Sequence, residues 1–148
     1  DHLPLYRQEN IWKRYGIDYP RASMCRTVLK SAEYCEPLLQ LMKQDLLSHP
    51  YLQVDETTVQ VLNEPNKKNT SKSYMWCYRG GPPNQRMLLF EYQPSRAGQH
   101  AKDFLNGFKG HVQCDGYSGY EWLTLDPDKT QGGCRMHVRR KFVEAAKL

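Results

Sequence analysis

Two aspartates in this sequence stand where a carboxylate can act as a metal ligand. Asp55 follows a strand-like run that includes Leu52 and Val54, and Asp115 ends a second such run, 60 positions later (115 − 55). A carboxylate at the end of a buried strand is held on a rigid element, where a hard cation such as Mg²⁺ finds oxygen ligands in place. Two such carboxylates brought together by a sheet form the minimal frame of a two-metal phosphoryl-transfer site, with ions about 3.5–4 Å apart.

Each aspartate also has a simpler interpretation. Asp55 begins a polar stretch and would on its own most often cap a turn, and Asp115 with Gly116 forms a common turn dipeptide. Their parallel placement favours metal binding. Glu56 is adjacent to Asp55, but consecutive strand residues point to opposite faces, so the two cannot ligate one ion and Asp55 is the preferred ligand. Such a site normally needs a third carboxylate, and the sequence offers no convincing candidate.

The elements that must position these aspartates follow from hydrophobic periodicity. A period of two predicts strands, and a longer period predicts helices between and after them. The strands are expected at residues 52–62, 74–79, 87–92 and 111–114, a helix at 98–107, a short helix or turn at 116–123, and a last helix from about 135. Short connections make the first three strands an antiparallel meander, and a crossover reaches the fourth. This is the order of an α/β, ribonuclease H-like mixed sheet, whose first and fourth strands are neighbours.

The first 50 residues are predicted to be helical. Apolar residues near a 3.6 period predict a helix over 3–15, ended by Gly16. Ser23 is the expected N-cap of a long second helix, which Pro37 kinks or restarts and which ends at His49-Pro50. Two helices joined by a short turn are the outline of a DNA-binding helix-turn-helix, or of two helices that pack on a neighbouring domain. We therefore expect a helical segment at 1–50 and a partial ribonuclease H-like core at 51–148.

Composition bounds the function less sharply. The net charge of +5 is spread along the chain and is weak evidence for nucleic acid. Five cysteines without a Cys-x-x-Cys pair are typical of reduced, intracellular thiols. No apolar run approaches the about 20 residues of a membrane span. The start without methionine and the end within a predicted helix suggest a piece of a longer protein.

Several other residues are candidates for binding nucleic acid. Lys67, Lys68 and Lys72 form a basic loop cluster. Cys134 and His137 have the spacing of half a zinc site, but no second half occurs. The tyrosines suit either base stacking or core packing, and the basic helix suits either phosphate contacts or a solvated face. The expected nucleic-acid-binding residues are Arg139, Arg140, Lys141, Tyr117, Tyr120 and His137. The absence of phosphate-loop, nucleophile-elbow and His-Glu-x-x-His motifs argues against a nucleotide hydrolase, an esterase or a zinc protease.

Five sequence blocks together resemble the transposases of the insertion sequence 66 family. They are Val54-Asp55-Glu56-Thr57-Thr58-Val59, Tyr74-Met75-Trp76-Cys77-Tyr78, Pro94-Ser95-Arg96, Cys114-Asp115-Gly116-Tyr117-Ser118-Gly119-Tyr120, and the stretch from Gly133 to Phe142. The leading Leu3-Pro4-Leu5-Tyr6-Arg7-Gln8 stretch also matches, so the resemblance runs in order across almost the whole chain.

The resemblance implies a DDE-type catalytic core with a ribonuclease H-like fold that uses two Mg²⁺ or Mn²⁺ ions. It implies that Asp55 and Asp115 are the first two catalytic and metal-binding acids, and that the third, a glutamate, lies beyond the Arg-Arg-Lys-Phe block and outside this chain. Glu144 matches no catalytic position. Arg135 stands where an aromatic residue is common in the family. The family's zinc-binding and DNA-end-recognition segments would precede Asp1.

The expected function is that of a transposase fragment with negligible activity of its own. The intact enzyme would cut the 3′ ends of an insertion sequence and join them to target DNA, acting as a homo-oligomer in the bacterial cytoplasm, associated with the nucleoid. The alternative is a DNA-binding module that uses residues 1–48 and the basic helix. A cellular ribonuclease H-like nuclease is a third reading, which the sequence blocks outside the two acids do not favour.

Overall fold

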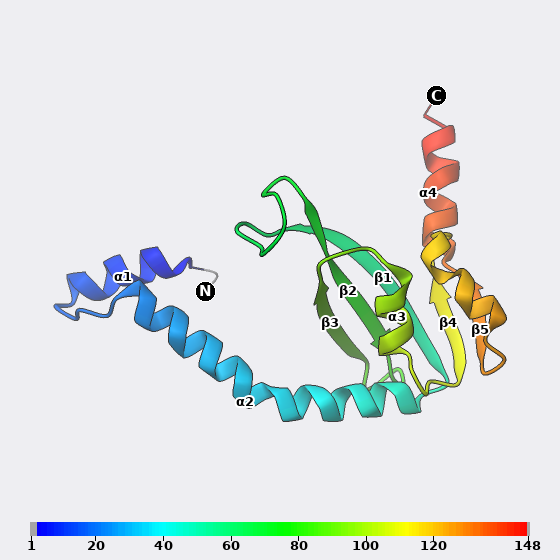
Figure 1. The fold of residues 1–148 in the computed structure, drawn as a ribbon, viewed down its shortest axis with the longest axis horizontal. Helices are drawn as coiled ribbons and strands as arrows, with labels where there is room; N and C mark the ends of the chain where they lie inside the picture. The colour runs from blue at the N-terminus through cyan, green and yellow to red at the C-terminus, as the bar shows by residue number, and fades with distance from the viewer. Residues whose placement is uncertain (1–2, 148) are drawn as a thin grey trace. The chain divides into compact units, whose positions relative to one another are not determined.

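The chain forms two compact units, residues 1–41 and residues 42–148 (Figure 1). The computed structural model describes residues 3–147, so residues 1, 2 and 148, the outer ends of the two predicted segments, lie outside the described part. The boundary between the compact units falls inside the predicted helical segment rather than at residue 50.

The first unit consists of α1 (Leu5–Arg14) and the first part of α2 (Arg21–Ser48). Gly16, with a φ of 74°, turns the chain after α1, and the amide of Ile17 donates to the carbonyl of Trp12 over 3.0 Å. The second helix starts at Arg21, before the expected cap. Pro37 lies inside α2, and the helix continues through it, so the predicted restart there is wrong.

The second unit is a mixed α/β structure built on a five-stranded sheet. The strands are β1 (Tyr51–Gln60), β2 (Lys72–Gly80), β3 (Met87–Gln93), β4 (Gly110–Cys114) and β5 (Lys129–Gly133), in the spatial order β3-β2-β1-β4-β5. The first three strands pair antiparallel, whereas β4 pairs parallel with β1 and with β5. The predicted meander and the neighbouring first and fourth strands are therefore confirmed.

The edge strand β5 corrects the predicted order, which placed only a turn and a glycine pair in this region. Its sequence, Lys129-Thr130-Gln131-Gly132-Gly133, has no apolar alternation, because neither face of this edge strand is fully buried. Backbone hydrogen bonds to β4 hold it in the sheet. Hydrophobic periodicity cannot predict this kind of strand, because the strand is held by hydrogen bonds to the backbone of another segment and not by burial of alternate side chains.

One face of the sheet is covered by the helix α3 (Gly98–Phe104), the 3₁₀ helix η1 (Ser118–Leu125) and the end of α2. Alternate residues of the strands β1 to β4 point into this core. The ring of Tyr78 stacks on that of Phe104 with centroids 3.4 Å apart. The largest fully buried side chains include Trp76, Tyr78, Tyr120, Phe108, Leu46, Leu52, Leu105, Leu123 and Val112.

The opposite face carries the other alternate residues and is far more exposed. It presents Tyr51, Gln53 and Asp55 from β1, and the apolar side chains of β3 that are exposed are Leu88, Phe90 and Tyr92. The last helix, α4 (Arg135–Ala145), begins directly after β5 and buries none of its residues. No helix in the described part of the chain combines the length and apolar character needed to cross a membrane.

Candidate functional site

The register of the two central parallel strands brings Asp55 and Asp115 to the same level. Gln53 pairs with Gln113, an offset of 60 positions, and the two aspartates are separated by the same offset. Asp55 lies within the ten-residue β1 rather than at its end, so that part of the prediction is wrong. The parallel pairing nevertheless stops at Gln53, and Asp55 therefore stands beside the point where β4 ends.

A histidine joins the two aspartates. Asp55, Asp115 and His137 each offer one ligand atom, and these atoms all lie within 4.8 Å of one another. Asp55 is exposed, whereas Asp115 and His137 are half-buried. The Nδ1 atom of His137 is buried and has no hydrogen-bond partner. A histidine with one buried, unpaired ring nitrogen therefore lies beside two carboxylates, and the three side chains together offer three ligand atoms to a cation.

The start of α4 explains how His137 reaches this position. Gly133, the last residue of β5, pairs with Cys114, and the amide of Cys134 donates to the carbonyl of Cys114 over 2.8 Å. The helix therefore begins level with the end of β4, and its first turn carries His137 next to Asp115. From the sequence alone, His137 is predicted only as a nucleic-acid contact and as half of a zinc site.

Backbone amides orient both aspartates. Asp115 Oδ1 accepts a hydrogen bond from the amide of Tyr117 over 3.0 Å, and Asp55 Oδ1 accepts one from the amide of Glu56 over 3.0 Å. The tight turn after β4 thus holds the Asp115 carboxylate in place at the strand end. Both carboxylates keep further lone pairs that can accept a cation.

Glu56 points to the opposite face of β1, as predicted, and both of its carboxylate oxygens are bound by side chains of the protein. Its side chain is 1% exposed. Its Oε1 accepts from Arg96 Nη2 over 2.6 Å and from Arg96 Nε over 2.7 Å, and its Oε2 accepts from the Tyr120 hydroxyl over 2.5 Å. Burial would lower the pKa of Arg96, but the hydrogen bond to Glu56 and its charge raise that pKa above its ordinary value.

Arg96 links this buried network to the aspartate pair. Its Nη2 lies 3.8 Å from Asp115 Oδ2, and its guanidinium stacks over the ring of Tyr117 at 3.9 Å from the centroid. The Tyr117 hydroxyl donates to the carbonyl of Arg96 over 2.8 Å. Gly98 allows this segment to approach η1, since a Cβ there would stand 2.0 Å from the carbonyl oxygen of Gly119. Sequence reasoning assigned no role to Arg96, although one of the family-like blocks contains it.

The two tyrosines of this region have different positions. Tyr120 is fully buried and meets Trp76 edge-to-face at 6.1 Å. Burial, and then the hydrogen bond to Glu56, raise the pKa of its hydroxyl well above the ordinary range, so it remains a protonated donor. The prediction that Tyr120 stacks on a base is therefore wrong, and the core-packing alternative holds. Tyr117 is half-buried against Arg96, and its contact with nucleic acid stays a prediction.

A cavity of about 360 Å³ surrounds the cluster of Asp55, Asp115 and His137. Arg79 from β2 and Arg140 from α4 also line it, together with Cys77, Cys134, Gln53, Val54, Gln113 and Met136. Arg139 lines a neighbouring hollow with Arg140, and Lys141 lies 3.9 Å from Glu144. Of the predicted basic run, the structure therefore brings Arg140 to the aspartates and leaves Arg139 and Lys141 exposed outside the cavity.

The loop lysine Lys67, by contrast, is committed to internal contacts. Its Nζ donates to Ser73 Oγ over 2.8 Å and to the carbonyl of Pro94, and it lies 3.3 Å from Glu64 Oε1. Its side chain is 23% exposed. This lysine therefore ties the β1–β2 loop to the sheet.

The donor set of the cavity fits a divalent cation. Two carboxylates whose oxygens lie within 4.8 Å of each other repel when both are ionised. A cation between them reverses the sign of this interaction. Carboxylate oxygens suit Mg²⁺ and Mn²⁺, and an imidazole nitrogen adds affinity for the transition metal.

One family model matches the whole chain. The model of the family described as Transposase IS66 family matches residues 1–148. Two similar proteins come from Sinorhizobium fredii (strain NBRC 101917 / NGR234): Uncharacterized protein y4jD, 31% identical over 160 residues, and Uncharacterized protein y4qI, 30% identical over 156 residues. The alignments cover 99% and 97% of this chain but 31% and 29% of the relatives.

The chain thus spans about a third of the length of these curated relatives. No solved structure matches it significantly. Because the family match includes every position of the sequence, among them Asp55, Asp115 and His137, this chain belongs to the IS66 family of transposases.

Proposed function

We propose that this chain contributes two acidic ligands to the active site of a DDE-type transposase with a ribonuclease H-like core. The intact protein would cut the DNA ends of an insertion sequence and join them to target DNA. The observation that carries the proposal is the meeting of Asp55, Asp115 and His137, with ligand atoms within 4.8 Å of one another, beside the point where the parallel pairing of β1 and β4 stops. Family membership makes DNA the expected substrate.

Asp55 and Asp115 would hold the cations, with His137 as a nitrogen ligand. Divalent cations in such a site offset the charge that develops on a phosphate group and lower the pKa of an attacking oxygen. In the first step, a water oxygen would bond to phosphorus as the bond from phosphorus to the 3′ oxygen breaks, so that the 3′ oxygen gains a proton. In the second, the oxygen of that 3′ hydroxyl would bond to a target phosphorus as the bond from this phosphorus to the target strand's own 3′ oxygen breaks, and the departing 3′ oxygen gains the proton that the attacking hydroxyl loses.

The other residues of the cavity would orient and charge-balance these steps. Arg96, fixed by Glu56, keeps a positive charge 3.8 Å from Asp115 and would help to orient that carboxylate. Arg140 lines the same cavity and would bind oxygens of the entering phosphate. Arg139 and Lys141 on the same helix would contact neighbouring stretches of the DNA backbone.

Within residues 3–147, the cluster contains two acids, and the third of the DDE scheme is not among them. Glu144 lies on α4 and is paired at 3.9 Å with Lys141, away from the cluster. We therefore propose that the 148-residue chain alone binds a cation but cleaves DNA poorly. The alternative is a DNA-binding module without catalysis, which the exposed basic residues of α4 would serve equally well.

A manganese titration separates these two functions. Mn²⁺ broadens nuclear resonances near its binding site, so amide signals around Asp55, Asp115 and His137 should fade first if the chain holds a catalytic cation. Asp55→Asn should remove the effect, whereas Asp18→Asn, an exposed aspartate in the α1–α2 connection, should not. A titration that leaves these signals unchanged would favour the DNA-binding module.

A further inference from the structure

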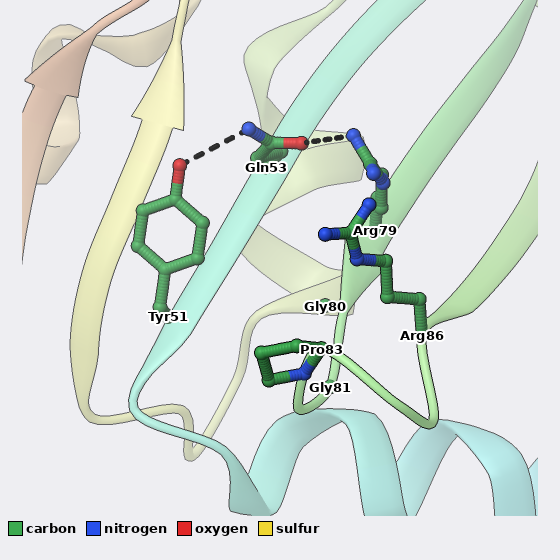
Figure 2. Close-up of a pocket in the computed structure, with 7 residues that line it drawn as sticks. All are labelled: Tyr51, Gln53, Arg79, Gly80, Gly81, Pro83 and Arg86. Carbon is green, nitrogen blue, oxygen red and sulfur yellow. Dashed lines mark hydrogen bonds between the residues drawn. The ribbon is translucent and has the colours of Figure 1, made fainter.

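A second cavity, of about 340 Å³, lies on the open face of the sheet (Figure 2). It is lined by Tyr51 and Gln53 of β1, by Arg79 and Gly80 of β2, and by Gly81, Pro83 and Arg86 of the β2–β3 turn. Tyr51, Gln53 and Asp55 alternate along β1, so the cavity opens on the same face as the aspartate pair.

Hydrogen bonds hold one of its two arginines in place. Arg79 Nη1 donates to Gln53 Oε1 over 3.0 Å (Figure 2). Gln53 Nε2 in turn donates to the Tyr51 hydroxyl over 3.1 Å and to Gln113 Oε1 over 2.7 Å. This chain of neutral groups runs across three strands and orients the guanidinium of Arg79 without neutralising it.

The turn that carries Arg86 is also rigid. Gly81 has a φ of 87°, and a Cβ there would stand 2.5 Å from the carbonyl oxygen of Gln85. Two prolines follow Gly81, and the amide of Gln85 donates to the carbonyl of Pro82 over 3.0 Å. The turn therefore fixes the backbone from which Arg86 reaches back into the cavity (Figure 2).

The charges of the two arginines are uncompensated. Among residues 3–147, neither Arg79 nor Arg86 has a carboxylate oxygen within 4.0 Å, whereas Arg96 contacts both Glu56 and Asp115. Two guanidinium groups around one hollow repel each other and attract an anion. Their planar, forked donors match the oxygens of a phosphate.

The arginine cavity adjoins the metal-binding cavity. Gln53 and Arg79 line both. Arg79 pairs with Gln53, which lies two residues from Asp55, so its backbone is displaced by roughly 7 Å along the strand direction. This displacement is similar to about two steps of the 3.4 Å rise per nucleotide of a DNA strand.

We infer that Arg79 and Arg86 form a phosphate subsite, which binds the backbone of the DNA strand beside the phosphate that reacts at Asp55 and Asp115. The inference rests on the proposed function for the identity of the reacting strand. The subsite contacts phosphate oxygens rather than base edges, so it contributes affinity and strand direction without sequence preference.

Binding of a labelled DNA oligonucleotide to the 148-residue chain, measured by fluorescence anisotropy at several salt concentrations, tests the subsite. Arg79→Gln and Arg86→Gln should each weaken binding about tenfold and reduce the salt dependence by about one counterion. Lys109→Gln is the matched control, because it removes an exposed positive charge that lies 3.3 Å from Asp128, elsewhere in the sheet unit. Equal binding by all three variants overturns the inference.

Nuclear magnetic resonance of the wild-type chain provides a test that needs no variant. The Nε–H signals of Arg79 and Arg86 should shift with a six-nucleotide thymidine oligomer and much less with inorganic phosphate at equal concentration. Equal shifts with both would indicate a site for free phosphate and would overturn the DNA assignment.

The same samples keep the two proposals distinguishable. Arg86→Gln, which changes a side chain that lines only the arginine cavity, should leave the Mn²⁺ titration at Asp55 and Asp115 unchanged. If the arginine variants bind DNA as tightly as the wild type while the Mn²⁺ response is intact, only the subsite is refuted. If the arginine variants weaken DNA binding but Mn²⁺ leaves the signals around Asp55 and Asp115 unchanged, only the metal site is refuted.

Discussion

Asp55 and Glu56 are adjacent carboxylates with opposite surroundings. Asp55 faces the open side of the sheet, where its partners within reach are another carboxylate and a histidine. Glu56 faces the core, 1% exposed, with a guanidinium and a tyrosine hydroxyl bound to its oxygens. A buried carboxylate must have all its hydrogen-bond and charge partners inside the protein. An exposed carboxylate is solvated by water and stays available to bind a ligand.

The two sides are coupled through Arg96. It binds the buried Glu56 directly and approaches the partly exposed Asp115 at 3.8 Å. The buried network therefore serves as the support for the open site. Variants on each side should separate a role in folding from a role in chemistry.

The largest effect is expected on DNA cleavage by the intact protein. Asp55→Asn and Asp115→Asn should lower strand cleavage by at least about 10³-fold, because each removes a charged cation ligand, while DNA binding persists. Cleavage of a labelled element end and a gel-shift assay measure the two properties. Glu144→Gln is the control and should cleave normally. An active Asp55→Asn protein would end the metal-site proposal.

The next largest effect is on stability, and it should be asymmetric. Arg96→Leu leaves Glu56 buried beside only the Tyr120 hydroxyl, and it should lower the free energy of unfolding by about 3 kcal/mol. Glu56→Gln leaves Arg96, whose side chain is 42% exposed, free to be solvated, and it should cost about 1 kcal/mol.

Urea denaturation of the 148-residue chain measures these changes. Asp55→Asn, on the open side, should leave the free energy of unfolding unchanged or raise it, because it relieves repulsion with Asp115. A loss for Asp55→Asn that equals the loss for Glu56→Gln would contradict the division between the two faces.

A third prediction concerns the choice of cation. His137→Ala should weaken Mn²⁺ binding about tenfold and Mg²⁺ binding much less, because imidazole nitrogen suits transition metals better than Mg²⁺. Calorimetric titration with each ion measures the difference. His49→Ala, which alters a histidine outside the cluster, is the control. Equal losses for both ions would show that His137 acts on the shape of the site rather than as a ligand.

The smallest expected effect is on the pH dependence of stability, and it comes from Glu64, a partly buried carboxylate of the β1–β2 loop. The hydrogen bond from Ser73 Oγ, 2.5 Å long, is the main cause that lowers the pKa of Glu64 below 4.5, and the nearby Lys67 adds to it. A pKa that is lower in the folded state contributes stability above the unfolded value, and this contribution disappears as the pH falls through the folded value.

Glu64→Gln should therefore reduce stability near neutral pH and flatten the loss of stability below pH 4.5, as followed by urea midpoints over a pH series. Glu33→Gln, an exposed change on α2, should reproduce the wild-type pH profile. A Glu64→Gln profile parallel to the wild type would show that this loop carboxylate does not stabilise the fold.

Much of the fold was accessible from the amino-acid pattern. Alternation along the chain predicted the meander and the position of the fourth strand, and through them the meeting of Asp55 and Asp115. The strand β5 was not accessible, because its residues are held by backbone pairing at a sheet edge and bury little apolar surface. The basic run on α4 was visible in the sequence, but which of its members faces the aspartates was not.

The amino-acid sequence specified which chemical groups the site can contain, namely two carboxylates 60 positions apart, a histidine and several arginines. Which of these groups meet was settled by folding. Glu56 finds Arg96 across 40 positions and Tyr120 across 64, and Gln53 finds Gln113 across 60. Local preferences act over a few residues, whereas burial, pairing and the approach of like charges depend on which distant segments the sheet places side by side.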